Sequence, residues 1–563
     1  MTAIEAIHSP RSRDISNHQQ QNMAEICVED SVKMDELLSS KQTRGLKILF
    51  LSSDTGGGHR ASAESLAKQF QLLFPGSTYD LLDIVEKDGV PPYNSLVKGY
   101  KHLSAHPSQW KLVYNVSNSR AFEMLADAHL KLMCEKAVRK SIKSYNPDVV
   151  ISVHPLMTNV PVLSCSKITK ELGKKLPMFT VVTDLGSAHC LWFANGVDKM
   201  FVGSEQVKQL AMSRGKVPEE KIVLAGLPIR HDFAVQSENL GDRMSPEGKA
   251  YQQTVRQQLE LPVIDKPTIL VMGGGEGVGS LSHIVDAMYV ELVTQGIDAL
   301  IVVICGRNEK LRKDFAERDW KHVLNRWQAA KQRMGLTNRF LSMDVCGPQS
   351  VIPSPGCIET SGVTGSIRRM LSQGSLSLGG AYLTSLNGDI ATTTDDKRDP
   401  VEEESGDVSE SQGEEEAVPV EVNSNTSTEN AGSVQVLGVG FVSNIAEYMV
   451  AADILVSKAG PGTISEAAAL SLPIMLTSFL PGQEEGNVEY VVEGGFGAYC
   501  SDSDPMAIAE EVCMWLTDPT KLEQLSRSAK IKGVPYAARN IAQAIGDMTF
   551  DFLNESQKAN HSS

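Results

Sequence analysis

The first half of the chain alternates short apolar runs with segments whose apolar residues recur at helical spacing. The run at 47–53 is followed by Asp54, Thr55 and three glycines, and residues 59–74 then place Ala63, Leu66 and Phe70 on one face of a helix. Further apolar runs predict strands, and a helix is predicted at 119–144. The predicted strands lie at 78–84, 148–153, 178–183, 199–203 and 221–226. Strands that alternate with helices indicate a parallel sheet covered on both faces.

A second series of the same kind follows a polar stretch at 234–265. It opens with the apolar run 268–275, which again ends in glycines, and a predicted helix at 280–295. Further predicted strands lie at 299–306, 434–439, 453–457 and 473–477. The fold class predicted for the chain is therefore α/β, with two successive Rossmann-like, doubly wound domains.

These patterns divide the chain into domains. We predict a disordered arm, an N-terminal Rossmann-like domain, an interdomain linker, a C-terminal domain and a tail. The boundaries are 1–43 for the arm, 44–233 for the first domain, 234–265 for the linker, 266–545 for the second domain and 546–563 for the tail. The second domain is interrupted at about 345–432 by a polar segment with too few apolar residues to offset its chain entropy, which we interpret as a disordered insertion.

Charge and cysteine content exclude several classes of protein. The net charge is −16, but residues 389–432 hold 14 acidic and two basic side chains, so the remaining 519 residues carry only −4. The sequence lacks the excess of basic residues that is typical of nucleic-acid-binding proteins. Nine cysteines without a CxxC pair fit a reducing compartment rather than a disulfide scaffold. No targeting sequence is legible at the N-terminus, and no apolar run is long enough to predict a membrane span.

The first glycine loop carries the candidate general base. Gly57 and Gly58 follow the first predicted strand, where backbone amides can approach a ligand closely. His59 follows at the start of the helix, and histidine suits base catalysis near neutral pH. Asp184 and His189 are rivals, because the strand before Asp184 ends at the same edge of the sheet.

The second half contains three further candidate sites. Gly274 and Gly275 nearly form a dinucleotide fingerprint, but Ser280 breaks its register and the next strand lacks an acid after it, so we favour a diphosphate loop over NAD binding. The segment 457–467 leads through Gly460 and Gly462 into a helix, whose amides and Thr463 could hold an anion while Glu466 accepts ribose hydroxyls. Gln483, Glu484 and Asn487 form a candidate clamp for sugar hydroxyls.

From about 44 to 552 the chain resembles the monogalactosyldiacylglycerol synthases, lipid galactosyltransferases of the GT-B class in glycosyltransferase family 28. The resemblance rests on several unusual strings in the same order. They are SDTGGGHRASAE (53–64), TDLGSAHCLWF (183–193), GLPIR (226–230), MGGGEG (272–277), ICGRN (304–308), GFVSNIAEYM (440–449), KAGPGTISEA (458–467) and PGQEEGN (481–487). The segment 311–433 is far longer than the family leads us to expect.

The resemblance implies a role for each matching residue. His59 would deprotonate the acceptor, and Arg230 would lie near the donor diphosphate. The segment at Phe441 and Val442 would cradle uracil. Gly460, Gly462 and Thr463 would form the diphosphate loop, Glu466 would bind ribose, and Gln483, Glu484 and Asn487 would hold the donor sugar. Pro92 and Trp192 would lie where the family contacts lipid.

The implied activity is inverting transfer of galactose from UDP-galactose to the free hydroxyl of diacylglycerol. The implied setting is a plastid envelope, with the protein peripheral to the membrane and activated by anionic phospholipid. No cofactor or metal is expected: Asp502 and Asp504 precede a predicted helix with Pro505 in its first turn, so we interpret Asp504 as a helix cap. A glucosyl transferase, a protein that only binds a nucleotide sugar, and an NAD oxidoreductase remain as alternatives, and a homodimer stays open.

The segment 85–120 is the candidate membrane contact. It mixes aromatic and apolar side chains such as Tyr93, Trp110 and Tyr114 with cations such as Lys101 and Lys111. That mixture suits an interfacial anchor on anionic lipid. The alternative is an ordinary amphipathic cover for the sheet.

Overall fold

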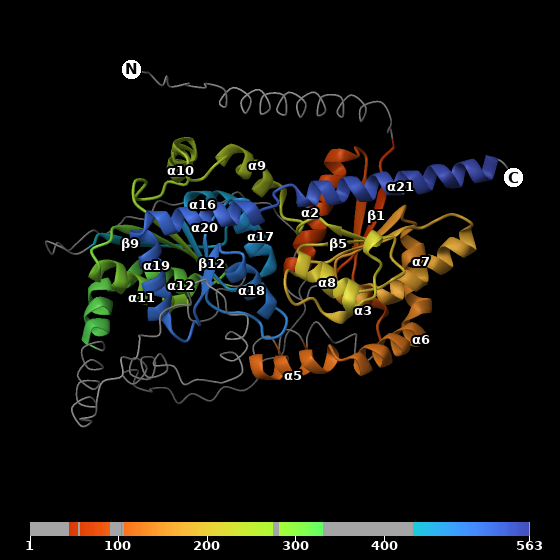
Figure 1. The fold of residues 1–563 in the computed structure, drawn as a ribbon, viewed down its shortest axis with the longest axis horizontal. Helices are drawn as coiled ribbons and strands as arrows, with labels where there is room; N and C mark the ends of the chain where they lie inside the picture. Colours follow the sequence, from red (N-terminus) through yellow and green to blue (C-terminus); the bar gives the residue numbers. More distant parts are fainter. Residues whose placement is uncertain are drawn as a thin grey trace, which may run out of the picture.

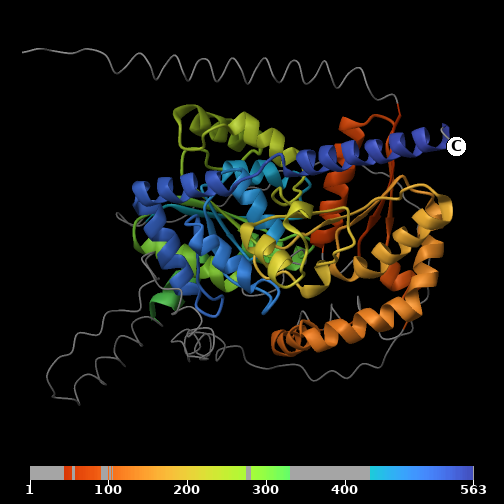
Figure 2. The same cartoon turned by 45° about the vertical axis from the view of Figure 1, so that its right-hand side comes forward.

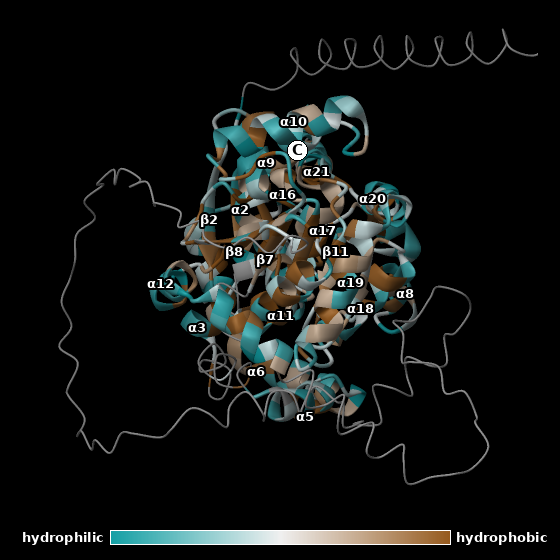
Figure 3. Ribbon diagram, turned by 90° about the vertical axis from the view of Figure 1, so that its left-hand side faces the viewer, coloured by the Kyte–Doolittle hydropathy of each residue, from teal (hydrophilic) through white to brown (hydrophobic). Residues whose placement is uncertain are grey.

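The computed structural model describes residues 44–53, 57–90, 99, 103, 106–273, 281–329 and 432–561. The predicted arm at 1–43 and nearly all of the predicted insertion at 345–432 lie outside these ranges. The described residues form two α/β halves side by side (Figure 1). Hydrophobic strands such as β7 and β8 lie at the centre of the second half, while polar helices such as α12 and α20 lie on its outside (Figure 3).

The first half is built on a six-stranded sheet in the order β2-β1-β3-β4-β5-β6, in which all pairs are parallel. Its strands are β1 (Lys47–Leu51), β2 (Thr78–Leu82), β3 (Val149–Ser152), β4 (Met178–Val181), β5 (Lys199–Val202) and β6 (Ile222–Leu224). Its helices are α2 (Gly57–Leu73), α3 (Ile84–Asp88), α5 (Pro107–Ser117), α6 (Arg120–Tyr145), η2 (Pro155–Met157), α7 (Asn159–Leu172), η3 (Cys190–Trp192), α8 (Glu205–Ser213) and η4 (Glu219–Lys221). The predicted strands and the helices expected at 59–74 and 119–144 are thus present.

The second half contains a second parallel sheet of six strands, in the order β12-β11-β10-β7-β8-β9. Its strands are β7 (Thr268–Met272), β8 (Ala299–Ile304), β9 (Val434–Val439), β10 (Ile454–Ser457), β11 (Ile474–Leu476) and β12 (Gly497–Tyr499). Its helices are α9 (His231–Leu240), α10 (Pro246–Gln258), α11 (Leu281–Thr294), α12 (Glu309–Glu317), α16 (Ile445–Ala451), α17 (Pro461–Ala469), α18 (Glu485–Glu493), α19 (Pro505–Thr517) and α20 (Pro519–Lys532). The sequence did not predict β12.

The last helix returns to the first half. α21 (Ala537–His561) packs against α2 (Figure 1), and Ile541 and Ile545 are fully buried in the same core as Phe50 and Phe70. The segment that we expected as a tail from 546 continues this helix without a break as far as 561. The two halves are therefore connected twice, once between β6 and α9 and once between α20 and α21.

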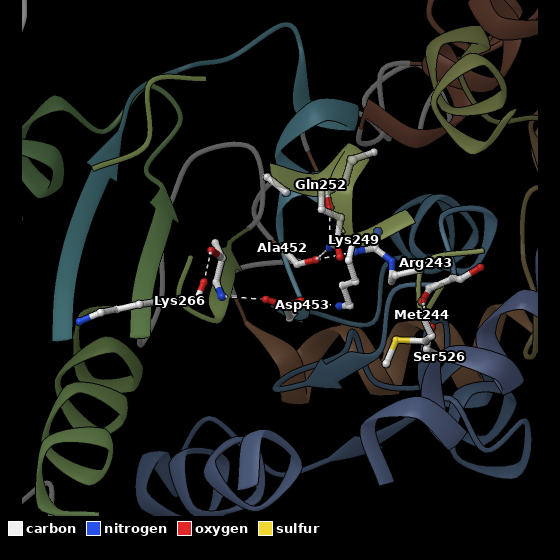
Figure 4. A network of polar contacts seen from close by, with 12 residues as sticks. Arg243, Met244, Lys249, Gln252, Lys266, Ala452, Asp453 and Ser526 are labelled. Carbon is white, nitrogen blue, oxygen red and sulfur yellow. Dashed lines mark hydrogen bonds and ion pairs between the residues drawn. The ribbon is translucent and has the colours of Figure 1, made fainter. Parts of the chain in front are cut away.

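The segment predicted as a polar linker at 234–265 is largely helical. α9 and α10 pack against α16, and α9 also contacts α17. Phe233, Leu240 and Val255 are buried in the core of the second domain, and polar side chains add to this contact: Arg243, Gln252 and Arg256 are also buried. The polar side chains gather around the backbone near Ala452 and Asp453 (Figure 4). Buried polar side chains of this kind explain why an apolar pattern did not reveal the helices.

Arg243 joins the ends of two helices. Its guanidinium donates to the carbonyls of Met449 and Val450 near the end of α16, to that of Ala452, and to that of Leu470 at the end of α17. The last carbonyls of a helix have no partner within it and carry partial negative charge. Burial lowers the pKa of Arg243 to about 10, so the side chain is still charged at neutral pH.

We expect Arg243→Met to destabilise the protein by about 3 kcal/mol or more, because it leaves buried carbonyls without donors. The measurement is the midpoint of urea unfolding of the full chain. Lys249→Met is the control: Lys249 pairs with Asp453 at 3.1 Å but is 41% exposed, so its loss should cost at most about 1 kcal/mol. Equal shifts for the two variants would contradict the role given to Arg243.

Candidate functional site

The two halves meet through loops at the carboxyl ends of their sheets. The loop after β4 reaches the loop between β11 and α18, where Gly186 and Gly486 are in backbone contact: a Cβ atom on Gly186 would lie 2.0 Å from the carbonyl of Gly486. The Gly186 N–H donates to Asn487 Oδ1 at 3.1 Å, and the Gly486 N–H donates to Ser187 Oγ at 2.7 Å. This contact brings the carboxyl ends of both sheets to one place.

Each sheet has its topological switch point at this edge. In the first sheet the chain order reverses between β1 and β3, and in the second between β7 and β10. Open α/β sheets bind ligands outside the carboxyl ends of strands at such points. His59 follows β1 and His154 follows β3, so the first switch point carries two histidines whose rings lie 4.8 Å apart, edge to face.

His59 is held as a neutral base. Its Nδ1 lies 2.8 Å from Thr183 Oγ1 at the end of β4. Burial lowers the pKa of His59 to about 4, although a hydrogen bond to the backbone of Val153 raises it somewhat. Burial and the neighbouring His59 also lower the pKa of His154. The imidazole of His59 is therefore unprotonated at neutral pH, as base catalysis requires.

Asp184 lies in the same cluster but does not contact His59 by a hydrogen bond. Its Oδ2 accepts a hydrogen bond from Trp192 Nε1 at 2.6 Å. Burial and the negative charge of Glu484 raise the pKa of Asp184 to about 7, against the effect of the Trp192 hydrogen bond. Glu484 belongs to the second domain, and its charge acts on the pKa of Asp184 in the first, so Asp184 faces the second domain.

Trp192 and His189 complete the cluster on the first domain. Trp192 is fully buried in η3, with its ring 5.9 Å from that of His59, so it lies beside the candidate base and not at an outer surface. His189 caps η3, and its Nε2 lies 3.2 Å from Ser117 Oγ at the end of α5. Burial, with a contribution from the nearby Arg214, lowers the pKa of His189 to about 4.

The second domain contributes the start of α17. Gly460 is the N-cap of this helix and Pro461 is its first residue, so the amides of the first turn have no partners within the helix. No described atom lies within 4 Å of a Cβ atom placed on Gly462, which leaves room beside this turn, and Thr463 is half-buried. Lys458 lies just before the turn and pairs with Glu484 at 2.7 Å.

Arg230 and Glu466 are brought together across the domain boundary. Arg230 lies between β6 and α9, and its Nε and Nη2 lie 2.9 and 2.8 Å from Glu466 Oε1. Burial raises the pKa of Glu466, and the charge of Arg230 opposes that shift. The pair places one cation and one carboxylate at the second turn of α17, the helix that begins after Gly460.

The remaining predicted site residues are placed as follows. Gly58 is exposed at the start of α2, which begins at Gly57. Phe441 is 72% exposed after β9, with Val442 half-buried. Gln483 is half-buried, whereas Asn487 is fully buried and its Nδ2 donates to the Ala459 carbonyl. Both ends of the Asn487 amide are thus occupied by backbone in this conformation. Pro92, Gly274 and Gly275 lie outside the described residues.

The interpretation of Asp504 as a helix cap is confirmed. Its side chain accepts the Ala507 N–H, and Pro505 occupies the first position of α19. Within the ranges that the structure describes, no three His, Cys, Asp or Glu side chains are grouped so as to hold a metal ion. The expectation that the reaction needs no metal stays a prediction.

Sequence reasoning missed three residues at this edge. Thr183 contacts His59, His154 lies against it, and Lys458 precedes the Gly460 turn. Each follows directly on a strand of its sheet, within two residues of the strand's last residue. A search for polar residues at the ends of all predicted strands would have found them, whereas we searched around glycine loops.

Two protein families match the chain. Residues 59–229 match the monogalactosyldiacylglycerol (MGDG) synthase family, and residues 405–541 match the glycosyltransferase family 28 C-terminal domain. The first match begins at His59 and ends just before Arg230. The second includes the Gly460 turn, Glu466 and the loop at 481–487.

The chain is also similar to individual proteins. The chain is 29% identical over 511 residues to a probable monogalactosyldiacylglycerol synthase 2, chloroplastic, of Oryza sativa subsp. indica, covering 90% of this chain and 81% of the relative. It is 27% identical over 520 residues to monogalactosyldiacylglycerol synthase 2, chloroplastic, of Arabidopsis thaliana, covering 91% and 83%. A crystal structure of Acinetobacter baumannii MurG aligns with a TM-score of 0.45 at 11% identity, covering 89% of this chain and 99% of that one. The two Rossmann-like domains thus carry, in order, a match to the monogalactosyldiacylglycerol synthase family and a match to the glycosyltransferase family 28 C-terminal domain, and over 90% of its length the chain is similar to a probable monogalactosyldiacylglycerol synthase.

Proposed function

We propose that this protein transfers galactose from UDP-galactose to the free hydroxyl of 1,2-diacylglycerol, with inversion at the anomeric carbon. The observation that carries the proposal is the contact at Gly186 and Gly486. It places the neutral imidazole of His59 and the Gly460 turn of the second domain at the same edge of the molecule. The reaction is the one after which the relatives, monogalactosyldiacylglycerol synthases, are named.

The chemistry follows from these groups. The acceptor oxygen attacks the anomeric carbon, His59 takes the hydroxyl proton, and the bond from that carbon to the β-phosphate oxygen breaks. The electron pair leaves with UDP. The amides at the start of α17, with Lys458 beside them and Arg230 at the next turn of the helix, would stabilise that charge without a metal. Thr183 would orient the imidazole through its hydroxyl.

A donor would have to rearrange two ion pairs. Lys458 is paired with Glu484, and Arg230 with Glu466. If UDP engages both cations, Glu466 becomes free to accept ribose hydroxyls and Glu484 to accept sugar hydroxyls. The pairs therefore keep four buried or half-buried charges balanced before the donor arrives.

Plastid envelopes are the proposed location, because the relatives are named chloroplastic. Among the described residues, no helix combines the length and the apolar character needed to cross a bilayer. We therefore propose that the protein acts from the membrane surface and meets its lipid substrate through an exposed face.

α5 and α6 carry that face. Both helices lie along one edge of the molecule (Figure 2), and the segment 107–145 has seven basic and three acidic side chains, a net of +4 in a chain of net −16. Several of their large apolar side chains are exposed: on α5 they lie three or four residues apart, and on α6 they form two adjacent pairs about two helical turns apart. These are Leu112 (67%), Val113 (43%), Val116 (52%), Met124 (74%), Leu125 (71%), Leu132 (82%) and Met133 (52%). An apolar stripe among cations suits an anionic lipid surface.

The product assay tests the function directly. Purified protein given diacylglycerol should form a galactolipid with UDP-galactose, detected by thin-layer chromatography, and little product with UDP-glucose. His59→Ala should abolish transfer while calorimetry still detects UDP binding, because the imidazole serves the acceptor. If that variant keeps near-normal turnover, Asp184 and not His59 is the base. If product forms from UDP-glucose alone, the donor is UDP-glucose.

The pH dependence of kcat separates the two candidate bases. A base must be unprotonated, so the rate falls as pH falls through its pKa. With His59 as base (pKa about 4), kcat should stay level from pH 8 down to about 5. With Asp184 as base (pKa about 7), kcat should already fall about fivefold between pH 7 and pH 6. If His59 is the base, the Asp184→Asn variant should show the same level dependence of kcat on pH as the unaltered protein.

The lipid face is tested by charge insertion. Leu125→Asp with Leu132→Asp should reduce binding to vesicles containing phosphatidylglycerol by at least about tenfold, since each change places a charge where an apolar side chain would be buried. Co-sedimentation measures it. Ile531→Asp on α20 is the matched control, because Ile531 is 82% exposed like Leu132 but lies far from α5 and α6 in the sequence. If the unaltered protein, the double variant and the control bind vesicles equally, α5 and α6 do not form the lipid-binding face.

A further inference from the structure

α5 has two different sides. Leu112, Val113 and Val116 are exposed on the outer side, which belongs to the proposed lipid face. Tyr114 is only 6% exposed and points the other way, into the junction of the two domains. The helix is short, with eleven residues, so a displacement of its outer side would move Tyr114 with it.

Tyr114 contacts both loops that close the junction. Its hydroxyl donates to the Ser187 carbonyl at 2.9 Å, in the loop of the first domain. Its ring lies against Gly482 in the loop of the second domain, where a Cβ atom would come 2.6 Å from the ring. Gly482 has a φ of +81°, so glycine suits the position both for its backbone and for the space.

The same two loops hold each other directly. Ser187 accepts the Gly486 N–H, and Asn487 accepts the Gly186 N–H. The loop at 481–487 also carries Glu484, which pairs with Lys458 beside the Gly460 turn. Tyr114 is thus the described side chain through which α5 reaches the proposed donor site.

The Tyr114 hydroxyl is fixed as a donor. Burial, with the negative charge of Asp184 as the next cause, raises its pKa far above neutrality. The ring also packs edge to face against His189, with centroids 5.4 Å apart. His189 in turn contacts Ser117 at the end of α5, so the inner side of the helix is attached to the first domain at two places.

We propose that α5 couples contact with a lipid surface to closure of the two domains around the donor, with Tyr114 as the positioning residue that connects the helix to the loop at 481–487. This inference rests on the proposed function, since it assigns the loop to the donor and the outer side of α5 to lipid. When the outer side is held by a membrane, Tyr114 keeps both loops in contact and the donor site stays assembled.

The coupling has a direction that thermodynamics fixes. If a lipid surface favours the closed arrangement and UDP binds that arrangement better, vesicles must tighten UDP binding. By linkage, UDP must tighten vesicle binding by the same factor. A protein in which α5 is only an anchor would show neither effect.

The experiment is calorimetric titration of UDP with and without phosphatidylglycerol-containing vesicles. The unaltered protein should bind UDP at least about fivefold more tightly when vesicles are present. Tyr114→Ala should bind UDP equally with and without vesicles, while still binding the vesicles themselves. Tyr114→Phe keeps the ring against Gly482 and should retain part of the effect, which a general loss of folding would not produce.

A second variant tests the outer side. Leu112→Asp should bind UDP in buffer as the unaltered protein does, but gain little from vesicles. A Tyr114→Ala protein that still shows the full vesicle effect would overturn the proposal. That outcome is distinct from failure of the proposed function, which would appear as absent UDP binding or absent galactolipid in the unaltered protein.

Discussion

The backbone contact between Gly186 and Gly486 is the constraint on which the site depends. A side chain on either residue would collide with the opposite loop, so only two glycines allow the carboxyl ends of the sheets to come so close. The hydrogen bonds through Asn487 and Ser187 then fix the register of one loop against the other. His59 on one domain and the Gly460 turn on the other owe their proximity to this contact.

The buried charges at the junction show how such a site stays stable when empty. Burial keeps His59, His154 and His189 neutral, so three imidazoles can lie together without mutual repulsion. The carboxylates Glu466 and Glu484 are each paired with a cation. Asp184 is the exception, because its pKa is raised to about 7 by burial and by Glu484. Its charge will therefore respond to whatever binds between the domains.

The apolar runs predicted most of the fold because buried parallel strands are apolar on both faces. Eleven of the twelve strands in the described part of the chain were found in this way; β12 has three half-buried residues and begins with glycine, so it leaves no run to detect. α9 and α10 were taken for a polar linker for a different reason. Arg243 just before α10, and Gln252 and Arg256 within it, bind backbone carbonyls of the domain, and hydropathy cannot distinguish a buried arginine from an exposed one.

The site was predicted only where local sequence carries the signal. Glycine turns after strands identified Gly58, Gly460 and Gly462, and the family resemblance added Arg230. Tyr114 could not be found in this way, because its partners Ser187 and Gly482 lie 73 and 368 positions along the chain. In the sequence it was one aromatic residue of a candidate membrane segment. In the fold, the same short helix exposes leucine and valine outward and extends Tyr114 to the donor-side loop, so one element can respond to both lipid and nucleotide.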